Sequence, residues 1–242
     1  PGIISFAGGA PDPELFPCDE LSEVAADVLK NNGKIALQYG VTEGYAPLRD
    51  WVKNRLVSQG IVKENDNNET IIVSGGQQGI DLASKSLLNP GDAVVCEQPS
   101  FIGGLNCFRS YNAEIYGVKV QSDGIDMEEL EALLKQHSNI KILYTIATFQ
   151  NPSGITMSLE KRKKLLELAE QYDFMIFEDN PYGELRFAGD DVPTIKSLDT
   201  QGRVVYLGSF SKILSPGIRV GFTSCDKELM DCLLYTSPSP RD

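Results

Sequence analysis

Short apolar runs alternate with longer amphipathic segments along most of the chain after Tyr39. Runs such as FMIFED and RVVYLG are almost continuously apolar, which is typical of strands covered on both faces by helices. Strands that alternate with helices predict a chain of βα units. The strands predicted in this way are Thr70–Ser74, Ala93–Glu97, Glu114–Val118, Lys141–Ile146, Phe174–Asp179, Val204–Gly208 and Ile218–Thr223.

Amphipathic segments between these runs predict helices at Gln77–Leu88, Met127–Gln136 and Leu159–Tyr172. The last of them follows Ser158, a residue type that caps helix N-termini, and has an acidic residue in its first turn. The predicted fold class is therefore α/β, with a mostly parallel central sheet covered by helices on both faces.

The two ends of the chain do not share this rhythm. Residues 1–50 are interpreted as an extended arm and one helix, Glu20–Asn31, which contribute to a small domain or a dimer contact, and residues 51–231 as the large domain. The chain opens inside a Gly/Pro-rich stretch without an initiator methionine, so we expect that preceding residues are missing. Residues 232–242, CLLYTSPSPRD, resemble a translated sequencing adapter and are left out of the fold prediction.

Composition narrows the class of protein. Hydrophobic residues make up 41% of the chain and charged residues 23%, ordinary values for a folded globular protein. A formal net charge of -12 would repel nucleic acid and anionic membranes, so we expect small molecules or protein as partners. No apolar run is long enough for a membrane span and no leader opens the chain, which favours a cytoplasmic location. Five cysteines without ligand-like spacing indicate neither a disulfide scaffold nor a metal site.

Polar clusters follow several of the predicted strands. SGGQQG follows the first strand, QNPSG the fourth, EDNPYG the fifth and GSFSK the sixth. Ligands of open α/β sheets bind beyond the carboxyl ends of the strands, where loops meet helix N-termini. Four such clusters predict one site at that edge of the sheet.

Each cluster alone leaves its role open. SGGQQG is compatible with a tight turn or with an anion site, in which glycines let backbone N–H groups approach a phosphate. Glu178 and Asp179 end an apolar strand, where a carboxylate needs a helix cap or a cationic partner. Lys212 by itself could be an ordinary solvated lysine.

The motifs taken together, in their order along the chain, are more specific than any single motif. The series SGGQQG, PSF, NPSG, EDNPYG, SFSK and GIRVGF resembles the motif set of the class I/II aminotransferases over nearly all of residues 1–231. The segments FAGGAPDPELFP and YGVTEGYAPLRDW also resemble the subgroup containing 2-aminoadipate aminotransferases. The resemblance implies pyridoxal-phosphate fold type I, pyridoxal 5'-phosphate as cofactor, an amino acid and a 2-oxo acid as substrates, and a homodimer.

The same resemblance implies roles for individual residues. Lys212 matches the lysine that forms the Schiff base and then moves the substrate proton. Asp179 matches the acid that keeps the cofactor's ring nitrogen protonated, and Tyr182 a hydrogen bond to the phenolic oxygen. Further cofactor-binding residues implied are Gly75, Gly76 and Gln77 at the phosphate, Phe101 on the ring face, Asn151 at the phenolic oxygen, Ser209, Ser211 and Arg219 at the phosphate, and Tyr39 across the dimer interface.

One departure from the family pattern stands out. Relatives carry a second domain after the cofactor lysine, with an arginine that binds the substrate carboxylate, and this chain ends before it. Gly8 and Gly9 resemble the arm that passes over the substrate. The small domain is therefore expected to be incomplete.

Two alternatives to transamination stay open. A carbon–sulfur lyase or decarboxylase can use the same fold, because the reaction depends on which substrate bond stands perpendicular to the cofactor ring. The effector domain of a transcription regulator also resembles this chain, but such regulators commonly lack the asparagine of NPSG and have another motif in place of EDNPYG. Asn151, Pro181 and Tyr182 therefore favour an enzyme.

Overall fold

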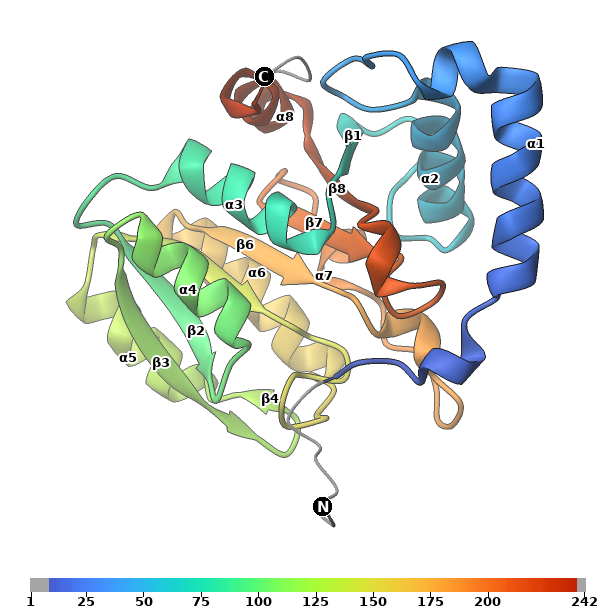
Figure 1. The fold of residues 1–242 in the computed structure, drawn as a ribbon. Coiled ribbons are helices and arrows are strands. Elements are labelled where there is room, and N and C mark those ends of the chain that lie inside the picture. The colour runs from blue at the N-terminus through green and yellow to red at the C-terminus, as the bar shows by residue number, and fades with distance from the viewer. Residues whose placement is uncertain (1–8, 239–242) are drawn as a thin grey trace.

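The computed structural model describes residues 9–238, and eight strands in that range form one sheet with helices on both faces (Figure 1). Their order across the sheet is β1-β8-β7-β6-β5-β2-β3-β4. The strands are β1 (Asn68–Val73), β2 (Ala93–Gln98), β3 (Glu114–Gln121), β4 (Gly124–Ile125), β5 (Ile140–Thr145), β6 (Met175–Asp179), β7 (Val204–Ser209) and β8 (Gly221–Asp226).

Most strands of the sheet run in the same direction. Strands β3, β2, β5, β6 and β7 run parallel to one another, whereas the short β4 is antiparallel to β3. Strand β8 is antiparallel to both β7 and β1, so β1 points the same way as β7. This confirms the prediction of a mostly parallel sheet. The loops after β1, β2, β5, β6 and β7, and the segment before β8, therefore meet at one edge.

Helices flank this sheet and precede it. They are α1 (Cys18–Ala36), α2 (Ala46–Ser58), α3 (Gly76–Leu87), α4 (Ile102–Ser110), α5 (Met127–Gln136), α6 (Leu159–Tyr172), α7 (Ile195–Leu198) and α8 (Lys227–Thr236), with 3-10 turns η1 (Pro13–Leu15), η2 (Gly183–Leu185) and η3 (Pro216–Ile218). Helices α5 and α6 have the bounds that the sequence predicts.

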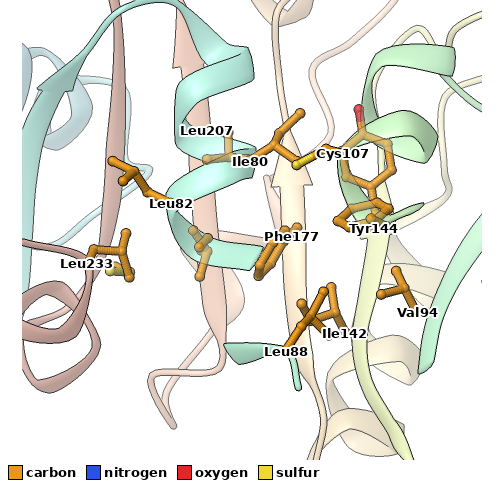
Figure 2. Packing of buried hydrophobic residues seen from close by; sticks show 14 of the residues in the cluster. Ile80, Leu82, Leu88, Val94, Cys107, Ile142, Tyr144, Phe177, Leu207 and Leu233 are labelled. Carbon is orange, nitrogen blue, oxygen red and sulfur yellow. The ribbon is translucent and has the colours of Figure 1, made fainter. Parts of the chain in front are cut away.

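Side chains alternate between the two faces along each strand, and each face has its own core. In β7, Leu207 packs in one cluster with Ile80 of α3, whereas Val204 packs in a second cluster with Leu165 of α6. Figure 2 shows the first cluster, in which Phe177 and Tyr144 of the sheet lie under α3 and α4. Burying one such large side chain stabilises the fold by about 1.5–3 kcal/mol.

Two of the longer helices, α2 and α4, were not predicted. Helix α4 contains Gly103 and Gly104, which lower helix propensity and hide its pattern. Packing explains Gly104, because a Cβ atom there would lie 3.1 Å from Cε1 of Tyr144. Helix α2 contains the expected domain boundary at residue 50, and its Val52 packs against the sheet.

Helix α8 begins in the sequence DKELMD, which has a helical pattern, and it runs on into the segment that was left out of the prediction. Residues Cys232–Thr236 continue this helix, and Leu233 is fully buried in the first cluster. Residues 237 and 238 follow the helix, and residues 239–242 lie outside the described part of the chain.

The strand predicted at Ile218–Thr223 is placed differently in the structure. Residues Pro216–Ile218 form the turn η3, and Arg219 adopts a left-handed conformation with φ of 52°. The strand therefore begins only at Gly221. This shift places Arg219 in the loop at the sheet edge, where its side chain is free to turn towards α3.

Helix α1 extends beyond the predicted Glu20–Asn31 and has no buried residue. Among the helices of residues 9–238, none is both long enough and apolar enough to cross a bilayer.

Candidate active site

The start of α3 and the loop before β8 form one corner of the sheet edge. Gly75 has φ of 79°, and a Cβ atom there would lie 2.2 Å from Nη2 of Arg219. The same Nη2 donates to the carbonyl of Ser74 at 3.3 Å. The guanidinium thus lies against a backbone that only glycine allows, beside the start of α3. The first-turn N–H groups there lack the acceptor four residues back, and that of Gln78 donates to the carbonyl of Gly75 at 3.1 Å. Such a corner favours an anion.

Two serines, Ser209 at the end of β7 and Ser211 after it, complete this corner. Ser209 Oγ lies 2.9 Å from Ser211 Oγ and accepts the Ser211 backbone N–H at 3.1 Å. The Cβ of Ser209 would lie 4.0 Å from a Cβ built on Gly76, so β7 and the start of α3 are adjacent. Gly75, Gly76, both serines and Arg219 therefore lie together, as predicted for a phosphate site.

Lys212 lies in the turn that follows β7. Its Nζ donates to the carbonyl of Gly9 at 2.5 Å. A Cβ atom on Gly9 would lie 3.9 Å from both Lys212 Nζ and Tyr182 Oη. The amino-terminal arm thus passes beside Lys212 and Tyr182, whereas Gly8 lies outside the described residues.

Asp179 is the last residue of β6 and is buried. Tyr144, on the neighbouring strand β5, donates its hydroxyl to Asp179 Oδ2 at 2.7 Å. Burial raises the pKa of Asp179 from 3.8 to about 6, and the Tyr144 hydrogen bond opposes this rise. Among the described residues no cation forms an ion pair with Asp179. Its buried carboxylate is therefore available to a cationic group of a ligand.

Asn151 and Tyr182 meet between the ends of β5 and β6. Asn151 Nδ2 donates to Tyr182 Oη at 3.4 Å. Burial raises the pKa of the Tyr182 hydroxyl, and the charge of Asp179 raises it further. The Tyr182 hydroxyl therefore lies near Asp179, and Asn151 lies beside that hydroxyl.

Phe101 and Gln77 lie at the neighbouring helix starts. Gln77 Nε2 donates to the carbonyl of Gly103 at 3.1 Å, which joins the first turn of α3 to that of α4. A Cβ atom on Gly103 would lie 2.5 Å from the ring of Phe101 and 2.7 Å from Gln77 Oε1. The aromatic ring is thus held beside the start of α3.

Tyr39 is the exception among the predicted residues. It follows α1, its side chain is 65% exposed, and its backbone N–H bonds to Gln38. No hydrogen bond within residues 9–238 links its hydroxyl to another predicted site residue. Its predicted role belongs to a contact between subunits, which one chain does not test.

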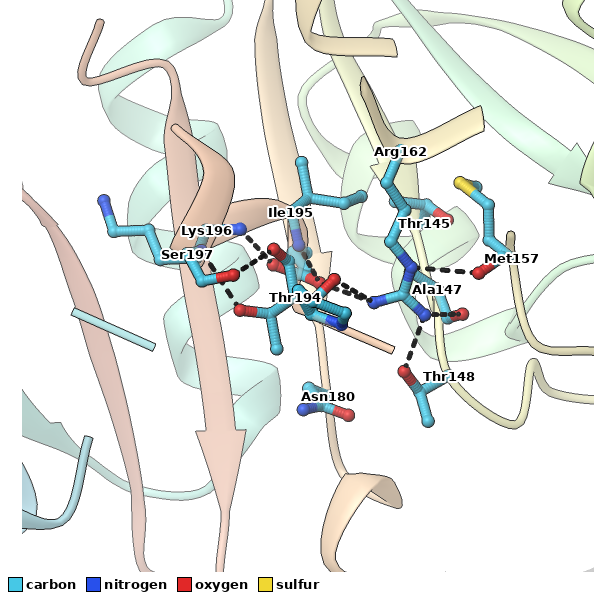
Figure 3. Close-up of polar contacts among 12 residues, drawn as sticks. Thr145, Ala147, Thr148, Met157, Arg162, Asn180, Thr194, Ile195, Lys196 and Ser197 are labelled. Atoms are coloured by element: carbon cyan, nitrogen blue, oxygen red, sulfur yellow. Dashed lines mark hydrogen bonds and ion pairs between the residues drawn. The ribbon is translucent and has the colours of Figure 1, made fainter. Parts of the chain in front are cut away.

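Glu178 precedes Asp179 in β6 but contacts other residues, namely Arg162 of α6 and the start of α7, which Figure 3 shows. It accepts the backbone N–H groups of Ile195 and Lys196 at 2.9 and 2.8 Å, and the fully buried Arg162 lies 3.8 Å away. The cationic partner expected for this pair of acids thus serves Glu178. Asp179 instead accepts a hydrogen bond from the hydroxyl of Tyr144.

Arg162 also anchors the loop that carries Asn151. Its guanidinium donates to the carbonyls of Ala147 and Met157 at 2.8 and 3.0 Å, and to Thr148 Oγ1 at 3.0 Å. Sequence reasoning missed Arg162, which stands in the basic run KRKK, and it missed Tyr144, which stands in an apolar run. The spacing of α6 offers a signal for Arg162, because positions 162, 165 and 169 share its buried face.

Comparisons with known proteins agree with this geometry. The family model for aminotransferase class I and II matches residues 2–239. Aromatic-amino-acid aminotransferase 1 of Thermococcus litoralis is 44% identical over 232 residues, covering 93% of this chain and 54% of the relative. The 2-aminoadipate transaminase of Thermus thermophilus is 41% identical over 237 residues, covering 97% of this chain and 58% of the relative.

A solved structure is similar over the same range. The kynurenine aminotransferase of Pyrococcus horikoshii, in complex with PMP, KYN as substrates and KYA as products, superposes with a TM-score of 0.92 at 41% identity. The match covers 96% of this chain and 58% of that one. The chain thus spans little more than half the length of the relatives it matches.

Proposed function

Because the chain belongs to the class I and II aminotransferases, we propose that the whole protein is a pyridoxal-phosphate-dependent transaminase that moves an amino group between an amino acid and a 2-oxo acid. The observation that carries this proposal is the arrangement at the sheet edge. A lysine amine, a buried carboxylate without a cation, and an anion corner lie at the ends of adjacent strands. Pyridoxal phosphate has a matching aldehyde, ring nitrogen and phosphate.

The fit of the site to this cofactor can be stated group by group. Lys212 Nζ is the amine that would hold the aldehyde carbon. Gly75, without a Cβ, leaves Arg219 and the start of α3 open to the phosphate, with Ser209 and Ser211 beside them. The pyridinium of the bound cofactor supplies a sink for the electron pair left when the substrate α-carbon loses its proton.

Asp179 would keep that ring nitrogen protonated. An opposite charge at short range favours the ionised form of a carboxyl, so a pyridinium N–H would lower the pKa of Asp179 from its raised value. Asn151 Nδ2 and Tyr182 Oη would bind the phenolic oxygen, and Phe101 would stack on the ring. The free Nζ of Lys212 is the base that takes the α-proton and returns it.

Further parts of the proposal concern the whole protein. We infer a cytoplasmic homodimer in which Tyr39 of the partner subunit binds the phosphate, with no nucleic-acid or membrane partner. The names of the relatives suggest aromatic amino acids and 2-aminoadipate as the first donors to test.

An isotope-transfer assay on the full-length protein tests the function. The protein is incubated with pyridoxal phosphate, 2-oxoglutarate and ¹⁵N-labelled phenylalanine or 2-aminoadipate, and mass spectrometry follows the label. We expect ¹⁵N-glutamate. A ¹⁵N-labelled amine formed together with CO2 would indicate a decarboxylase instead. With ¹⁵N-labelled cystathionine as the substrate, release of ¹⁵N-ammonia, a thiol and a 2-oxo acid would indicate a carbon–sulfur lyase. Cofactor binding without turnover of any donor, together with specific DNA binding, would indicate the regulator.

A further inference from the structure

Gln150, the residue before Asn151, is 3% exposed, and its side-chain amide is fully bonded. Its Nε2 donates to Glu97 Oε2 at 3.1 Å and to the carbonyl of Pro99 at 2.8 Å. Its Oε1 accepts the backbone N–H of Ser153 at 2.9 Å. The side chain thus links its own loop, after β5, to the loop after β2.

Glu97 makes the same connection from the other side. It stands next to last in β2 and is 5% exposed. Its Oε1 accepts the hydroxyl of Thr145 at 2.6 Å, and its Oε2 accepts the backbone N–H of Ile146 at 3.2 Å. Both donors belong to β5 or the residue after it. Burial raises the pKa of Glu97, and the charge of Asp179 adds to this rise.

The side chains of Glu97 and Gln150 connect β2 and β5 beyond the last backbone hydrogen bonds between these two strands. Strands β2 and β5 are paired as far as Cys96 and Tyr144. Beyond that point the two strands diverge: β2 continues beside β3 as far as Gln98, and β5 ends at Thr145 beside β6. The two chains then lead to Phe101 and to Asn151. In the described part of the chain, the bonds of Glu97 and Gln150 are the hydrogen bonds that join the two departing segments.

We propose that Gln150 is a positioning residue that fastens the loop carrying Asn151 to the loop carrying Phe101, and thereby holds two walls of the cofactor pocket at a fixed separation. This inference rests on the proposed function, because it assigns the clamp to the cofactor of that function. Gln150 does not touch the cofactor in this account. It acts through the backbone of its neighbour and through Pro99.

The substitution Gln150→Glu turns this clamp into a titratable one. It keeps the shape of the side chain but replaces the donor by an oxygen that faces two acceptors, the carboxylate of Glu97 and the carbonyl of Pro99. Protonation of either carboxyl restores one donor, and burial beside a second acid raises the pKa values of both. The other charged groups nearby are Asp179 of β6, which acts on Glu97, and Arg186, whose guanidinium lies 4.6 Å from the ring of Phe149.

The experiment measures the affinity of the full-length cofactor-free protein for pyridoxal phosphate by absorbance titration, at about pH 8.5 and about pH 6. Losing two hydrogen bonds predicts that Gln150→Glu binds about ten- to hundredfold more weakly than the parent at the higher pH. The ratio of variant to parent Kd should shrink towards one at the lower pH. Gln150→Met, which cannot regain a donor, should show the same weakening at both pH values.

Gln201→Glu is the matched control, because it adds the same charge at an exposed turn and should bind like the parent. Thermal unfolding of each cofactor-free variant, followed by circular dichroism, shows that the compared proteins are folded. A parent that binds the cofactor and a Gln150→Met variant that binds equally well would overturn the clamp alone. A Gln150→Glu variant whose Kd relative to the parent is the same at both pH values would also overturn the clamp. A parent that does not bind pyridoxal phosphate would overturn the proposed function, and the clamp with it.

Discussion

Replacing Tyr144 by phenylalanine tests how the site controls the charge of Asp179. The substitution removes the hydroxyl that donates to Asp179 Oδ2 at 2.7 Å inside the protein and leaves the ring packed against Phe108. Both residues are buried, so water does not replace the lost donor. A hydrogen bond to a charged group contributes about 1.5–3 kcal/mol, and one between neutral groups about 0.5–1.5 kcal/mol.

The sign of the pH dependence follows from the raised pKa of Asp179. The folded pKa of about 6 lies above the ordinary value of 3.8, so the folded protein binds this proton more tightly than the unfolded chain does. Stability therefore falls as pH rises through this window and is constant above it. Losing the Tyr144 donor should raise the folded pKa by about one unit more, which corresponds to about 1.4 kcal/mol.

Urea unfolding of the cofactor-free protein, with and without Tyr144→Phe, measures both effects. We expect a loss of about 1.5–3 kcal/mol at about pH 8.5, where Asp179 is ionised, and about 0.5–1.5 kcal/mol at about pH 5, where it is protonated. Tyr206→Phe is the matched control, because its buried hydroxyl accepts from the neutral amide of Asn180 at 2.8 Å. Its cost should be the same at both pH values. Equal losses for Tyr144→Phe at both pH values would refute the reasoning.

Three further predictions concern the whole protein. Gly75→Ala should displace Arg219, because the new Cβ would lie 2.2 Å from Nη2. Losing one hydrogen bond to the phosphate predicts about ten- to hundredfold weaker binding of pyridoxal phosphate in absorbance titrations, with unchanged binding of phosphate-free pyridoxal. Equal losses of affinity for both compounds would contradict the anion site at this corner. Asp179→Asn should lower single-turnover transamination about a thousandfold, or ~4 kcal/mol of barrier, with cofactor binding retained, whereas a rate within about threefold of the parent would make Asp179 a strand-end cap. Light scattering should show a homodimer, and a monomer with undiminished cofactor affinity would refute the shared site.

Local sequence signals predicted the helices and strands whose ends are set by capping residues and by the periodicity of their apolar positions. Helix α6 was predicted at its observed bounds because Ser158 caps it, accepting the Lys161 N–H, and an apolar face repeats along it. Helix α4 was missed because two glycines mask its pattern, and they are tolerated because the Phe101 and Tyr144 rings occupy the space of their side chains. The strand predicted to start at Ile218 was displaced by a proline turn.

The site was predictable where motifs end strands, since Lys212 and Asp179 follow apolar runs that lead to one edge. The contacts that support these residues were not predictable from local sequence. Tyr144 and Asp179 are 35 residues apart in the chain, and Gln150 and Glu97 are 53 apart. Tyr144 resembles any core residue of its strand until the register of β5 against β6 places it beside Asp179. Only the parallel pairing of the strands brings such partners together.

The central claim is that Lys212 holds the cofactor, and covalent trapping tests it most directly. The full-length protein is incubated with pyridoxal phosphate, reduced with borohydride, digested and mapped by mass spectrometry. We expect a pyridoxyl group on Lys212, in the peptide containing SFSK. A pyridoxyl group on another lysine, with Lys212 unmodified, would contradict it.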